Sequence, residues 1–154
     1  MKKLKKIISK EGAILISYLF IILFIYTASD KLWNYNDFKE FFMTLDVIHS
    51  FGQYLAWGIP ALEILISLSL LFPASRLPGL YATFGLMSLF TMYLIYMNFT
   101  AKELPCHCGG VISELSWTQH IWFNIALILL ASTGIYLELK SVKNLAIVPG
   151  QKTT

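Results

Sequence analysis

Long runs without charge are the feature that most constrains this chain. Three of them cover residues 12–29, 77–101 and 115–137, and a fourth, 47–75, is interrupted only by Glu63. A helix that crosses a bilayer needs about 20 mostly apolar residues, and each run meets or nearly meets that length. Only 14% of the residues are charged, against about 25% in a typical soluble domain. The sequence therefore predicts an all-α, polytopic membrane protein.

The predicted layout is a four-transmembrane-helix bundle in a single membrane domain, 1–154. The four spans are expected near residues 12–28, 53–72, 78–98 and 117–138, followed by a polar tail, 140–154. The strict alternation of a transmembrane β-barrel is not visible in any of the runs.

A short amphipathic helix is predicted between the first and second spans, within residues 37–50. Its apolar residues recur at steps of three and four, which is one face of a helix; they are Phe38, Phe41, Phe42, Leu45 and Ile48. We interpret this helix as a connector packed on the end of the bundle, with a lid over a substrate as the alternative.

The distribution of Lys and Arg predicts the orientation. With four spans, one side holds both termini and nine Lys or Arg residues, and the other side holds only three, Lys31, Lys39 and Lys102. Because positive loops stay in the cytoplasm, both termini are predicted to be cytoplasmic. The net charge of +3 is thus accounted for by topology, and gives no indication of nucleic-acid binding.

Both cysteines lie in a short polar gap between the last two runs, as Cys106-His107-Cys108-Gly109-Gly110. The predicted topology puts them outside the cytoplasm, where disulfides persist. A disulfide across one intervening residue closes a small, strained ring, and strained disulfides are oxidising and often catalytic. A protonated His107 would favour a thiolate.

The leading hypothesis is a redox-active pair; a local structural staple is one alternative. A zinc or copper site formed by Cys106, Cys108 and His107 or His120 is the other.

Three polar residues inside the spans are further candidates. His120 lies about one turn into the last span and should face the bundle interior, where it could accept a proton from a thiol or a quinone hydroxyl. Asn124 lies four residues on, on the same face. Glu63 lies near the bilayer middle, where a charge costs at least about 2.5 kcal/mol. Since no cation is expected at its depth, we predict an uncharged Glu63 that acts as a proton relay, a cofactor contact or a structural carboxyl. Packing roles remain the alternative for His120 and Asn124.

Several short motifs in this layout resemble the MauE/DoxX group of bacterial membrane proteins over about residues 10–140. They are Pro60-x-x-Glu63, Cys106-His107-Cys108-Gly109-Gly110, Trp117-x-x-His120 and Phe123-Asn124. The layout is also similar to the quinone-coupled, disulfide-forming membrane enzymes related to DsbB and to vitamin K epoxide reductase. MauE-type members are linked to maturation of the disulfide-rich small subunit of methylamine dehydrogenase, and DoxX-type relatives to oxidation of sulfur compounds with quinone.

The resemblance implies a thiol–disulfide redox protein of the bacterial inner membrane, with its cysteine loop in the periplasm. Cys106, Cys108, His107 and His120 would carry the exchange with a periplasmic partner. Quinone would be the electron sink, with Glu63, Trp117 and Asn124 as its candidate contacts. The chain has one cysteine pair, where the DsbB-like enzymes have two, which favours a partner-dependent protein and leaves open whether it is an enzyme. The alternatives are a non-catalytic maturation factor for a secreted client and a metal-binding membrane protein.

Overall fold

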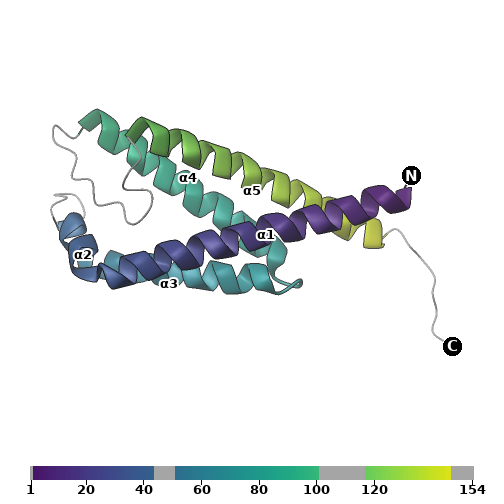
Figure 1. The fold of residues 1–154 in the computed structure, drawn as a ribbon, viewed down its shortest axis with the longest axis horizontal. Helices are drawn as coiled ribbons and strands as arrows, with labels where there is room; N and C mark the ends of the chain where they lie inside the picture. Colours follow the sequence, from purple (N-terminus) through teal and green to yellow (C-terminus); the bar gives the residue numbers. More distant parts are fainter. Residues whose placement is uncertain (1, 44–50, 101–116, 147–154) are drawn as a thin grey trace.

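The computed structural model describes residues 2–43, 51–100 and 117–146. These residues form five α-helices and no strand (Figure 1). The helices are α1 (Lys2–Trp33), α2 (Tyr35–Met43), α3 (Gly52–Leu71), α4 (Arg76–Thr100) and α5 (Trp117–Ala146).

Four of the helices are long and apolar enough to cross a membrane, which confirms the predicted all-α polytopic layout. The candidate spans are Lys10–Trp33, Gly52–Leu71, Arg76–Tyr96 and Thr118–Lys143. Two helices run well beyond the predicted spans: α1 already begins at Lys2, and α5 continues to Ala146, through the first part of the predicted polar tail. Hydropathy predicts only the part of each helix that crosses the bilayer. Because lysine and glutamate are good helix formers, the helical hydrogen bonds continue beyond that part.

The four long helices form a ring in which α1 packs against α3 and α5, and α4 packs against the same two helices. α1 begins and α5 ends at one end of the bundle, which we call the terminal end (Figure 1). α2 crosses the opposite end, which we call the α2 end, and the prediction of a short helix packed there is confirmed for Tyr35–Met43. The remainder of the predicted amphipathic helix, 44–50, lies outside the described residues.

The bundle has a core of large apolar side chains, among them Phe20, Phe24 and Leu80, and its helices approach closely at small residues. A Cβ placed on Gly134 of α5 would lie 3.0 Å from Ile16 Cγ2 and 3.1 Å from Leu80 Cδ2. Close backbone approach at small residues is typical of helices packed in a membrane. Large apolar side chains that are mostly exposed include Leu15, Ile22, Leu89, Met92 and Leu129. An outer surface of this kind suits lipid.

The packing predicts different effects of enlarging two glycines. Gly134→Leu should lower stability by about 1–3 kcal/mol, because its side chain must displace Ile16 and Leu80. Gly85→Leu is the matched control, since a Cβ at Gly85 meets nothing within 4 Å. The apparent melting temperature of each variant in one lipid or detergent would be compared with that of the parent protein. Equal losses for the two variants would contradict the packing.

Candidate functional site

Most buried hydroxyl groups in the bundle are satisfied within their own helix. Ser17, Ser67, Thr83 and Thr91 each donate to the backbone carbonyl four residues earlier, at 2.7–2.9 Å. Such bonds satisfy the hydroxyl locally and need no partner helix. Larger polar side chains buried in the bundle lack this local solution; they include Glu63, Arg76, His120, Asn124 and Glu138. These residues are therefore the candidates for a functional role in the bundle interior.

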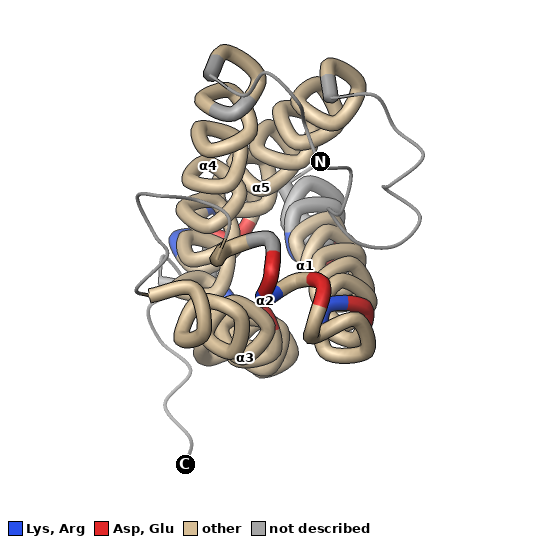
Figure 2. Tube along the Cα trace, turned by 90° about the vertical axis from the view of Figure 1, so that its left-hand side faces the viewer, with Lys and Arg blue, Asp and Glu red and all other residues tan. Residues whose placement is uncertain are grey.

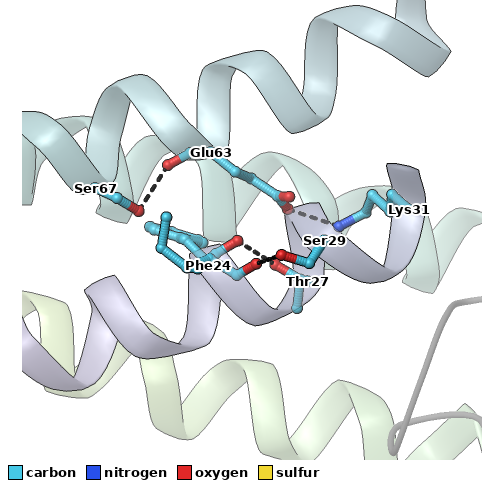
Figure 3. Close-up of polar contacts among 7 residues, drawn as sticks. Phe24, Thr27, Ser29, Lys31, Glu63 and Ser67 are labelled. Atoms are coloured by element: carbon cyan, nitrogen blue, oxygen red, sulfur yellow. Dashed lines mark hydrogen bonds and ion pairs between the residues drawn. The ribbon is translucent and has the colours of Figure 1, made fainter. Parts of the chain in front are cut away.

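Glu63 of α3 forms an ion pair with Lys31 of α1 (Figure 3). Lys31 Nζ donates to Glu63 Oε1 at 2.7 Å, and only 6% of the Glu63 side chain is exposed. Thr27 lies beside the carboxylate, but its hydroxyl donates to the Phe24 carbonyl at 3.2 Å. The second carboxylate oxygen, Oε2, is buried and has no hydrogen-bond partner among the described residues.

The expectation that no cation reaches Glu63 is wrong, and with it the basis for an uncharged carboxyl. In an α-helix each side chain tilts toward the N-terminus of its own helix. α1 and α3 are antiparallel, so Lys31 reaches from the α2 end toward the bundle centre, while Glu63 reaches toward the α2 end (Figure 3). The two backbones lie at different depths, and the charged groups meet between them.

This pairing predicts a strong non-additivity between substitutions at the two positions. Lys31→Met should cost about 3–5 kcal/mol, because it leaves the Glu63 carboxylate buried without its partner. The double variant Lys31→Met/Glu63→Gln should be more stable than Lys31→Met alone, since it buries no unpaired charge. Thermal unfolding of the parent, the two single variants and the double variant in one lipid composition measures this non-additivity. Lys10→Met, which changes an exposed lysine of the same helix, is the control. Losses that simply add would show that the ion pair is not formed.

His120 and Asn124 both face the interior, as the sequence predicts, and lie on one face of α5. They are 5% and 3% exposed. The His120 ring meets the Phe90 ring of α4 edge-on, with 5.9 Å between centroids. Asn124 Nδ2 is buried and has no hydrogen-bond partner in the part of the chain that the structure describes. This amide is therefore a free donor inside the bundle, close to an imidazole.

The structure separates the predicted site residues into two groups. Glu63 belongs to the α1–α3 contact with Lys31, whereas His120 and Asn124 belong to the α4–α5 side, with α3 and α5 diagonal in the ring. Trp117 is the first residue of α5, and its side chain lies outside the described residues. Cys106, His107 and Cys108 also lie outside them, between the last residue of α4 and the first of α5.

A second pair of opposite charges, which the sequence analysis missed, lies in the half of the bundle nearer the terminal end. Arg76 Nη1 of α4 is 3.9 Å from Glu138 Oε1 of α5, and each side chain is only 9% exposed. Arg76 Nε has no hydrogen-bond partner among the described residues. The sequence signal was the presence of opposite charges near the same end of two consecutive antiparallel spans.

A ring of four helices, each long and apolar enough to cross a membrane, with charged and amide side chains buried inside it, indicates a multi-pass membrane protein. The family model described as "Methylamine utilisation protein MauE" matches residues 9–137. The chain therefore belongs to the MauE family, which confirms the resemblance to MauE and indicates a membrane protein of methylamine utilisation. Comparisons with curated proteins and with solved structures gave no match.

Proposed function

We propose that the protein is a thiol–disulfide redox protein of the bacterial inner membrane that acts on or with a periplasmic partner. The observation that carries this proposal is the Cys106-His107-Cys108 motif, which lies in the sequence between α4 and α5. The buried His120 is the fourth residue of α5. In the sequence, the cysteine pair thus shortly precedes the helix that carries a buried histidine.

The exchange would proceed through a mixed disulfide. A thiolate of the partner attacks one sulfur of the Cys106–Cys108 disulfide, and the partner's second thiolate then resolves the adduct. The partner loses two electrons and becomes a disulfide, while Cys106 and Cys108 gain them and become thiols. His107 and His120 would hold and return the protons that accompany these steps.

Reoxidation of the cysteine pair needs an acceptor of two electrons and two protons, and a membrane quinone is the proposed one. The unpaired Asn124 amide supports this role, because it can donate to a quinone carbonyl. Glu63 is a weaker candidate for contact with the quinone, because its Oε1 already accepts from Lys31. Trp117 is also a candidate, since it begins the helix that carries Asn124.

The orientation is proposed from the charges, with the terminal end in the cytoplasm and the α2 end in the periplasm. Lys10, Arg76 and Lys140 belong to the terminal half of the helices, together with the N-terminal lysines of α1. An excess of Lys and Arg on one side marks the cytoplasmic side. The α4–α5 connection, which carries the cysteines, would then face the periplasm.

Single-cysteine variants test the exchange. Cys106→Ala or Cys108→Ala should accumulate a dithiothreitol-sensitive adduct with the partner on a non-reducing gel. The remaining thiolate attacks the disulfide of the oxidised partner, and the second cysteine that would release the partner in this reverse exchange is gone. The double variant, which has no cysteine, is the control and should show no adduct.

Two other outcomes would replace the redox proposal. If neither single variant traps a protein and the double variant still supports maturation of the secreted client, the protein is a non-catalytic maturation factor. If both thiols resist alkylation only while zinc or copper is present, Cys106 and Cys108 form a metal site with His107 or His120.

A further inference from the structure

The ammonium group of Lys31 joins three helices at one point. It belongs to α1, donates to Glu63 of α3 at 2.7 Å, and lies over the Phe38 ring of α2 with Nζ 5.9 Å from the centroid. A cation within about 6 Å of an aromatic centroid is attracted by the ring face. The Lys31 side chain of α1 thus contacts both α2 and α3.

α2 lies directly on the start of α3 and closes a small apolar cluster there. Phe42 of α2 and Ala56 of α3 are both buried, and Tyr93 of α4 packs against them. A Cβ added to Gly52 would lie 3.1 Å from Phe42 Cβ, so the two helices approach closely. At the other end of α2, the Tyr35 and Trp57 rings are 5.2 Å apart. Figure 2, which looks at the α2 end, shows α2 crossing in front of the bundle.

Aromatic contacts continue from this cluster to His120. The Tyr93 ring is 6.5 Å from the Phe90 ring, and Phe90 is 5.9 Å from His120. The position of α2 is therefore linked, through two side chains of α4, to the histidine on α5. A displacement of α2 would remove the packing on Tyr93 first.

The junction between α1 and α2 is very short, and helix-type hydrogen bonds run through it. The two helices are separated by a single residue, Asn34, whose backbone N–H donates to the Asp30 carbonyl at 2.9 Å. α2 has only nine residues, and a helix of that length is marginal unless something packs against it. Its position therefore depends on the contacts of its apolar face and on Lys31.

We propose that α2 is a hinged cover over this end of the bundle, held closed by Lys31, and that its opening uncovers the Phe42–Ala56 cluster and releases the aromatic packing on His120. The link to thiol chemistry rests on the proposed function. The cover itself does not, because the contacts that hold it among the described residues involve α1, α3 and α4.

Cysteine accessibility tests the cover in a Cys106→Ala/Cys108→Ala background. Ala56→Cys reports on the space beneath α2, and Ala131→Cys, at a fully buried position of α5, reports on the rest of the bundle. Gln53→Cys, exposed near the start of α3, gives the unhindered rate. Each probe is alkylated with N-ethylmaleimide in lipid nanodiscs.

Two changes release Lys31 without leaving an unpaired buried charge. Phe38→Leu removes the ring beneath the ammonium, and Lys31→Met/Glu63→Gln removes the ion pair as a unit. Either change should raise the alkylation rate of Ala56→Cys at least tenfold while Ala131→Cys stays protected. An unchanged rate at Ala56→Cys, or a matching rise at Ala131→Cys, would overturn the cover. The background has no native cysteine, so failure here is distinct from failure to trap a redox partner.

Discussion

The ion pair between Lys31 and Glu63 is the interaction on which the arrangement of α1, α2 and α3 depends. A carboxylate this deep in an apolar bundle persists only with a partner. Side chains tilt toward the N-terminus of their own helix, so in the antiparallel helices α1 and α3 the Lys31 and Glu63 side chains tilt in opposite directions and meet. The ion pair therefore forms in only one register of α1 against α3. The same ammonium reaches Phe38 and thereby fixes α2 across the end of the bundle.

The polar groups of the interior are divided between the two ends of the bundle. Nearer the terminal end, Arg76 and Glu138 tie α4 to α5. Toward the α2 end lie the Lys31–Glu63 pair between α1 and α3, the aromatic cluster beneath α2, and His120 near the start of α5. The proposed thiol chemistry would then belong to the α2 end, where α4 ends and α5 begins.

The spans could be predicted from the sequence because each helix must match the bilayer by its own composition. The inward direction of His120 and Asn124 could be predicted for the same local reason, since they share one face of one helix. Lys31 and Glu63 are 32 residues apart, and nothing local links them. A depth assigned to each backbone position ignored the reach of a long side chain, and this is why the cation at Glu63 was missed.

The central claim is that Cys106 and Cys108 form a redox couple that faces the periplasm. It is tested most directly by equilibrating intact cells with a series of glutathione redox buffers and then labelling free thiols with a membrane-impermeant maleimide. The account predicts that both thiols are labelled from outside, and that they are lost together in one two-electron transition as the buffer becomes more oxidising. Labelling only after lysis, or a pair that stays in one state across the whole series, would contradict it.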